Sequence, residues 1–77
     1  MNLVDARGTR CPMPVILAAR AAGDLVPGDV LVVLADDPAA AADLPAWGRL
    51  RGHAVRGVDH GDHTAYEVVI GGASAAR

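Results

Sequence analysis

The residue best suited to chemistry is Cys11, which is the only cysteine of the chain and stands in the run Arg10-Cys11-Pro12-Met13-Pro14. Proline is favoured at the first position of a helix, where its missing N–H group would have no partner anyway. Pro14 still falls in the first turn and removes a second donor of this kind. The run therefore predicts a helix over residues 12–22, with Cys11 as its N-cap.

A cysteine at a helix N-terminus faces free backbone N–H groups and the positive end of the helix dipole, which stabilises a nearby anion by about 0.3–1 kcal/mol at an exposed site. Arg10 adds a positive charge beside it. We therefore expect a lowered pKa for Cys11 and a thiolate that acts as a nucleophile. The alternative is a lone cysteine that packs as a small hydrophobic residue, although a loop that enters a helix usually lies at the surface.

A second group of residues with possible chemistry is the aspartate and histidine cluster at residues 59–63. It could bind a divalent cation, but two histidines in a hairpin turn lack a closed set of ligands, so we interpret it as a solvated turn. Asp36 and Asp37 could suggest Mg²⁺, yet Asp37 is explained as the N-cap of a helix that starts at Pro38. We expect no metal and no cofactor, and we expect His53 to be structural or exposed.

The composition is that of one small domain. The 77 residues are 52% hydrophobic but include no Phe, one Trp and one Tyr, so Val, Leu, Ile and Ala must form the core. The seven cations are all arginines spread along the chain, the formal net charge is −2 and aromatic residues are scarce, so direct binding of nucleic acid is not expected. A single cysteine suits a reducing cytosol. No apolar run approaches about 18 residues and no basic, apolar leader is present, so we expect a cytoplasmic protein with no membrane span.

Hydrophobic patterning and turn residues predict strands at residues 3–5, 30–35, 53–58 and 63–70, and helices at residues 12–22 and 38–51. Pro45 is expected to break or kink the second helix, because the residue before a proline is pushed away from helical geometry. Right-handed crossovers place both helices on one side of the sheet. The predicted fold is therefore α+β, a two-layer sandwich of order β-α-β-α-β-β with a mixed four-stranded sheet. Residues 1–70 form the single domain, and residues 71–77 are expected to be a frayed tail.

The strand at residues 30–35 is apolar on both faces, although the two helices cover only one face of the sheet. The other face must therefore be covered within the fold or meet another molecule. This leaves open an alternative function, in which the chain is a non-catalytic interaction or regulatory module that binds a partner through its apolar sheet face and Cys11 is incidental. A peroxide-type redox sensor is less favoured, because no second cysteine could resolve a sulfenate.

Four short motifs in residues 5–47 resemble the TusA/SirA-like family of small bacterial sulfur-carrier proteins: residues 5–15 around Cys11, Val26-Pro27-Gly28-Asp29, Ala35-Asp36-Asp37-Pro38 and Asp43-Leu44-Pro45-Ala46-Trp47. The resemblance implies the same two-layer fold. It also implies that Cys11 accepts sulfane sulfur as a persulfide, from a cysteine desulfurase or a rhodanese, and passes it to a downstream acceptor protein. Destinations in the family include thiolation of tRNA wobble uridine, molybdenum-cofactor-related sulfur supply and oxidative sulfur metabolism.

On this interpretation the chain is a sulfurtransferase-type carrier that serves as a protein co-substrate rather than a stand-alone catalyst, as a monomer or weak dimer. Arg10 would support the sulfur electrostatically, Pro12 and Pro14 would set the helix start, and Met13 would contact a partner. A solvated charge at Arg10 and a simply exposed side chain at Met13 are the alternatives. Met13 stands where some members carry Glu, and Gly48 follows Trp47 where some carry a second cysteine.

Overall fold

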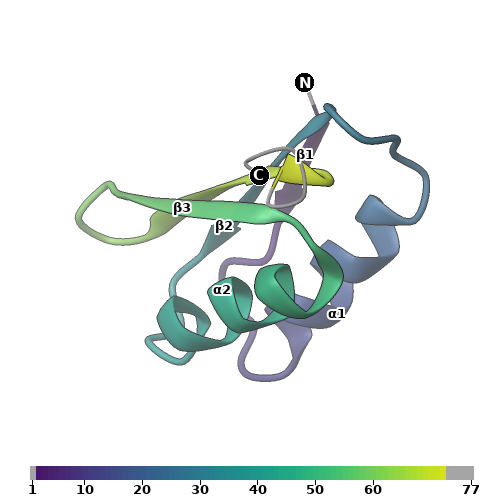
Figure 1. Cartoon of the computed structure of the whole chain (residues 1–77). Helices are drawn as coiled ribbons and strands as arrows, with labels where there is room; N and C mark the ends of the chain where they lie inside the picture. The colour runs from purple at the N-terminus through teal and green to yellow at the C-terminus, as the bar shows by residue number, and fades with distance from the viewer. Residues whose placement is uncertain (1, 73–77) are drawn as a thin grey trace.

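The computed structural model of the chain describes residues 2–72 (Figure 1). Its elements are β1 (Asn2–Asp5), α1 (Met13–Ala22), β2 (Val30–Ala35), α2 (Ala40–Arg51), β3 (Ala54–Asp59) and β4 (Thr64–Val69). The four strands form one sheet in the order β1-β2-β4-β3, in which β1 pairs with β2 in parallel and the other pairs are antiparallel. The predicted α+β fold with its mixed sheet is confirmed. Of the predicted tail, residues 73–77 lie outside the described residues.

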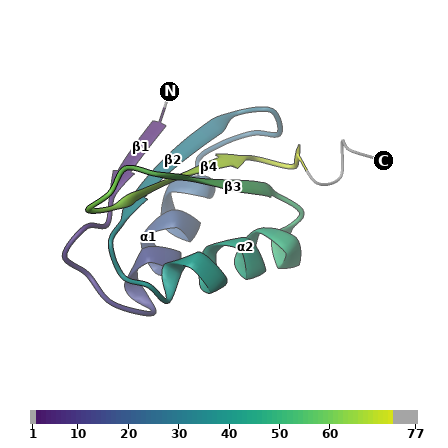
Figure 2. The ribbon, with the colours of Figure 1, turned by 90° about the vertical axis from the view of Figure 1, so that its left-hand side faces the viewer.

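Both helices pack against the same face of the sheet (Figure 2). The central strand β2 directs Leu31, Val33 and Ala35 toward them, and all three are buried. The antiparallel register places Val68 beside Leu31 and Tyr66 beside Val33 on that face. This alternation buries every second side chain of β2, so the core lies between the sheet and the helices.

The two helices reach the sheet through different residues. In α1, Ala18 is fully buried, since small side chains allow a close approach between helix and sheet. In α2, Leu44 is fully buried and Trp47 is 8% exposed. At Gly48 the backbone of α2 comes so close to β3 that a β-carbon would collide with the side chain of Val55 and lie 3.1 Å from the carbonyl oxygen of His53. Gly48 therefore sets the distance between α2 and β3.

The predicted break at Pro45 is wrong, because α2 runs without interruption from Ala40 to Arg51. Proline removes one N–H donor, and so it leaves the carbonyl of Ala41 without its helical partner. Ala41 is exposed, so water can bind that carbonyl. Leu44 and Trp47 lie on either side of Pro45 and both pack into the core. Tertiary packing thus keeps the helix continuous through a residue that would disrupt it in isolation.

The outer face of the sheet, which the helices leave uncovered, is largely apolar. Leu3 is 62% exposed, and Val30 and Val69 are 37% and 36% exposed. Arg56 and Glu67, which are register partners on β3 and β4, form a salt bridge of 3.0 Å on the same face. The prediction that β2 is apolar on both faces is confirmed. Among residues 2–72, the structure contains no helix long and apolar enough to cross a membrane.

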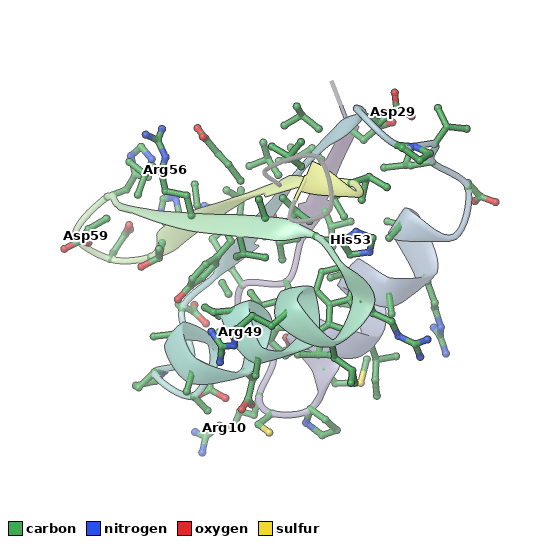
Figure 3. All side chains as sticks on the ribbon, in the orientation of Figure 1. Arg10, Asp29, Arg49, His53, Arg56 and Asp59 are labelled. Atoms are coloured by element: carbon green, nitrogen blue, oxygen red, sulfur yellow. The ribbon has the colours of Figure 1, made fainter. Side chains whose placement is uncertain are left out.

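His53 links the end of α2 to the end of β4. Its Nδ1 accepts a hydrogen bond of 3.0 Å from the backbone N–H of Gly71, and its ring lies 5.1 Å from the ring of Trp47. Figure 3 shows its position at the turn between α2 and β3. Burial, and to a lesser extent the charge of Arg51, lower the pKa of His53. The ring is thus held neutral, with Nδ1 as the acceptor, which confirms the structural alternative for this residue.

We expect Gly48→Ala to destabilise the protein by about 1–3 kcal/mol, because the new methyl group overpacks against Val55. The same substitution at an open helical site would stabilise it by roughly 0.5–1 kcal/mol. Gly23→Ala is the matched control, since that glycine has an ordinary φ of −62° and its β-carbon would lie 3.4 Å from the nearest atom. Urea unfolding measures both; equal stability of the two variants would contradict the close approach of α2 to β3.

We expect the free energy of unfolding to fall as the pH drops below the ordinary histidine pKa of about 6.5 and through the lowered pKa of folded His53. The unfolded chain then binds a proton that the folded chain resists, and protonation also breaks the bond from Gly71. His53→Gln should remove this part of the pH dependence and cost about 0.5–1.5 kcal/mol at pH 7.5. Urea unfolding at pH 7.5 and pH 5 tests this, with a substitution of the exposed His60, His60→Gln, as the matched control.

Candidate functional site

Cys11 lies exposed on the loop that joins β1 to α1. The loop begins with a backbone bond from Ala6 to Leu34 that extends the β1–β2 pairing, at 2.8 Å. The Thr9 hydroxyl then donates to the carbonyl of Ala6 at 2.7 Å. The N–H of Gly8 donates to the carboxylate of Asp36 at 3.0 Å. The loop is therefore held at several points along its length, and Figure 3 labels Arg10, the residue before the cysteine.

Asp37, the second aspartate after β2, holds the cysteine itself. Its Oδ2 accepts a hydrogen bond of 2.7 Å from the backbone N–H of Cys11, and its Oδ1 accepts one of 3.1 Å from the N–H of Ala39. These two backbone bonds, assisted by the charge of Arg10, lower the pKa of Asp37. Asp37 was predicted to be the N-cap of α2, but the helix starts at Ala40 with Ala39 as the N-cap. The carboxylate instead joins the cysteine loop to the turn before α2.

The predicted N-cap position of Cys11 is also wrong. The N-cap of α1 is Pro12, and the helix begins at Met13, whose N–H donates to the carbonyl of Arg10 at 2.8 Å. The first α-helical bond runs from Ile16 to Pro12 at 3.1 Å. The cysteine thus lies one residue before the N-cap, in a turn that the Arg10–Met13 bond closes before the helix begins.

The expectation of a lowered cysteine pKa is corrected by the structure. Hydrogen bonding to the carboxylate of Asp43 raises the pKa of Cys11; some desolvation of the sulfur and the negative charges of Asp43 and Asp37 act in the same direction. Asp43 lies in the first turn of α2 and is half-buried. Two carboxylates, those of Asp43 and Asp37, therefore disfavour the thiolate at this site.

Comparison with known proteins identifies the family of this chain. The family model "Sulfurtransferase TusA" matches residues 2–72, which is nearly the whole chain. This chain belongs to the TusA family. The "Putative sulfur carrier protein YrkF" of Bacillus subtilis (strain 168) is 39% identical over 57 residues, covering 74% of this chain and 31% of that protein. The chain thus spans about a third of the length of this relative.

A solved structure agrees with the family assignment. The SirA-like protein from Desulfitobacterium hafniense superposes with a TM-score of 0.82 at 27% sequence identity, covering 92% of this chain and 99% of that one. The resemblance inferred from the four motifs is therefore confirmed. Membership of the TusA family supports a role as a sulfur carrier in general terms.

The residues predicted to support Cys11 in this TusA-family chain fall into two groups. Arg10, Pro12 and Met13 are exposed around the thiol, and Met13 is 37% exposed. Pro14 points inward and is buried. The charge of Arg10 acts on Asp37. The first group can therefore contact a partner, whereas Pro14 anchors the first turn of α1.

A pocket of about 360 Å³ lies beside the cysteine loop. It is lined by residues of the loop and of the segment that follows β2: Gly8, Thr9, Arg10, Asp36, Asp37 and Pro38. The pocket is lined by the positive charge of Arg10 and the negative charges of Asp36 and Asp37. Arg10 directly precedes Cys11, so the pocket lies next to the thiol. A polar side chain of a docked partner could enter it beside Cys11.

Asp43 is the site residue that the sequence did not reveal. It belongs to one of the four motifs, but 32 positions separate it from Cys11 (43 minus 11), and no local pattern pairs the two. Asp43 lies in the first turn of α2, and the first turns of two neighbouring helices can lie at the same end of a sheet. Its position in that turn is the feature of the sequence that could have suggested a place near Cys11. That signal requires knowledge of the packing of α1 against α2.

The aspartate and histidine cluster of the β3–β4 hairpin is separate from this site. His63 Nδ1 and Asp62 Oδ1 lie 2.6 Å apart, and the rings of His60 and His63 stack with their centroids 5.2 Å apart. Hydrogen bonding to His63 lowers the pKa of Asp62. Within residues 2–72, no three potential metal ligands come together. The hairpin side chains instead interact with one another.

We expect Asp37→Ala to destabilise the protein by about 1–2 kcal/mol, because two backbone N–H groups lose a charged acceptor. The cysteine loop should also loosen, so amide hydrogen exchange at Cys11 should become faster. Asp24→Ala is the control, since Asp24 is exposed beyond the C-terminal end of α1. Urea unfolding and hydrogen exchange measure the two effects; a variant indistinguishable from Asp24→Ala would show that the Asp37 bonds do not hold the loop.

Proposed function

We propose that this chain accepts sulfane sulfur on Cys11 as a persulfide and passes it to another protein. One observation carries the proposal: in a chain of the TusA family, the single thiol is exposed on a loop whose backbone is held by two aspartates. A fixed and accessible sulfur is what a carrier needs, because both of its reactions take place with sulfur atoms of other proteins. Arg10, Pro12 and Met13 surround the thiol and would contact those partners.

The chemistry requires one nucleophile. The Cys11 thiol loses its proton, and the thiolate attacks the outer sulfur of the donor persulfide. The sulfur–sulfur bond of the donor breaks, and its inner sulfur leaves with the bonding electrons and takes up a proton. The products are the Cys11 persulfide and the donor thiol, so no net oxidation occurs. An acceptor thiolate then attacks the outer sulfur of Cys11 in the same way, following the rules of thiol–disulfide exchange.

The donor class that fits this step is a cysteine desulfurase or a rhodanese, each of which presents a persulfide. The acceptor is a downstream protein of tRNA thiolation, cofactor sulfuration or sulfur oxidation. We propose that the chain works in the cytoplasm, because an exposed free thiol persists in a reducing compartment, and that it acts as a monomer or weak dimer. It meets nucleic acid only through its protein partners, since its arginines do not form a phosphate-binding stripe.

The outer sheet face supports a second candidate, a non-catalytic interaction module. Leu3, Val30 and Val69 are exposed there, and exposed apolar residues that form a patch often mark an interaction site. In that function Cys11 would be incidental, so the reactivity of the thiol separates the two candidates.

We expect wild-type protein to gain the mass of one sulfur atom when it is incubated with a cysteine desulfurase and cysteine, and to lose it again with dithiothreitol. Cys11→Ser should gain nothing, because it lacks the nucleophile. Intact-mass spectrometry reads both results, and a rhodanese with thiosulfate serves as an independent donor. Equal labelling of the two proteins, or no labelling of wild type by either donor, would contradict the carrier function and favour the interaction module.

A further inference from the structure

We propose that a pocket between the C-terminal ends of α1 and α2 binds the carboxylate group of a small organic acid through Trp47, Arg51 and His53. Cys11 precedes α1, whereas this pocket lies at the other end of that helix. Because α1 spans about 15 Å, an acid bound there does not touch the reactive sulfur. The inference therefore does not depend on the proposed carrier function.

The pocket has a volume of about 240 Å³. One wall belongs to the end of α1, and the other belongs to the end of α2 and the turn after it; the lining residues are Ala19, Ala22, Gly23, Trp47, Arg51 and His53. The α1 wall carries no side chain larger than a methyl group, which leaves space between the helices. This volume is below the range of about 300–1,000 Å³ that drug-sized ligands occupy, so the pocket suits a small molecule.

His53 contributes a hydrogen-bond donor to the lining of the pocket. Its Nδ1 accepts the backbone N–H of Gly71 at 3.0 Å, so the proton of the neutral ring lies on Nε2. Burial, together with the charge of Arg51, lowers the pKa of His53 and so keeps the ring neutral. The polar group that this side chain still has to offer is therefore the Nε2–H.

The other two polar side chains of the lining are donors as well. An indole offers only its Nε1–H, and a guanidinium offers five N–H groups and no acceptor. Within residues 2–72, the ring N–H groups of Trp47 and His53 donate to no other residue, and no side-chain nitrogen is both buried and unpaired. Both N–H groups therefore reach solvent. Arg51 is exposed and forms no salt bridge in the same part of the chain.

The end of α1 beside the pocket offers little to a cation. The last four carbonyl groups of a helix have no partner within it, but here the carbonyls of residues 19–22 all accept hydrogen bonds from the N–H groups of residues 23–25. Among residues 2–72, no acidic side chain lines the pocket. The pocket therefore favours a ligand that brings acceptor oxygens, and the charge of Arg51 favours one that is negative.

The apolar part of the lining favours an organic acid over an inorganic anion. The methyl groups of Ala19 and Ala22 and the ring of Trp47 present hydrocarbon surface. Sulfate would lose hydration there without compensation, whereas a short hydrocarbon chain gains free energy when it is buried against such surface. A carboxylate can also accept two parallel hydrogen bonds from the guanidinium of Arg51.

Propionate is the test ligand, and propionamide is its uncharged analogue of the same shape. Trp47 is the only tryptophan, so a single indole signal in a nitrogen–proton correlation spectrum reports directly on the pocket. At constant ionic strength, we expect propionate to move this signal to lower field until it saturates. Propionamide should leave it nearly unmoved, and sulfate should bind more weakly than propionate.

Two substitutions test the assignment of the lining residues. Arg51→Gln should weaken propionate binding about two- to fivefold, which is the effect of losing one exposed ion pair. Arg49→Gln is the matched control, because it removes the same charge from an exposed position of α2 that does not line the pocket. Ala19→Leu fills the pocket from an exposed position of α1 and should weaken binding further. Urea unfolding establishes that each variant folds.

Equal dissociation constants for Arg51→Gln and Arg49→Gln, or equal shifts with propionate and propionamide, would overturn the inference. Tighter binding of sulfate than of propionate would also overturn it, in favour of an inorganic anion. An acetylated and amidated tripeptide with a central Glu presents the same carboxylate from a protein chain; tighter binding of this peptide would replace the small acid by an acidic side chain of a partner. Cys11→Ser should bind propionate as wild type does, and loss of binding in that variant would place the acid at the thiol instead.

Discussion

The site depends on the carboxylate of Asp37, which binds the backbone N–H groups of Cys11 and Ala39 at once. The cysteine loop contains no regular secondary structure, and its position would otherwise be set only by its two ends. One side chain from the segment after β2 joins it to the turn that precedes α2. The carboxylate of Asp36 likewise accepts a hydrogen bond from the backbone N–H of Gly8. The Asp36-Asp37 pair therefore connects the end of β2 to the cysteine loop through side-chain hydrogen bonds. The sheet thereby fixes the place of the sulfur.

The fold was predictable from the sequence because its main determinants are local. Six consecutive apolar residues identify β2, and the alternation in β4 identifies its buried face. The errors arose where packing overrides local preference. Pro45 predicts a break, but Leu44 and Trp47 are buried on either side of it, and their burial holds α2 together. The helix starts were also displaced, since turns at Pro12 and Ala39 close before each helix begins.

The site was predictable only in part, for a different reason. The motif around Cys11 identifies the reactive atom, and the structure places that atom at the surface. Its charge state could not be inferred in the same way, because the sequence shows Arg10 as the neighbour of Cys11 but does not show Asp43. Electrostatic effects depend on separation in space, and Asp43, the first cause of the raised pKa, belongs to α2 and lies far from Cys11 in the sequence. A local motif therefore predicted the exposure of Cys11 correctly and the direction of its pKa shift wrongly.

The raised pKa also bears on how a single exposed thiol survives. Some members of the family carry a second cysteine after the tryptophan, where this chain has Gly48. Here a β-carbon at that position would collide with Val55, so the packing of α2 on β3 disfavours any larger residue. A resolving thiol is thus not available to rescue an oxidised Cys11. Because oxidation follows thiolate character and exposure, the raised pKa of Cys11 lowers its thiolate fraction and so slows its oxidation.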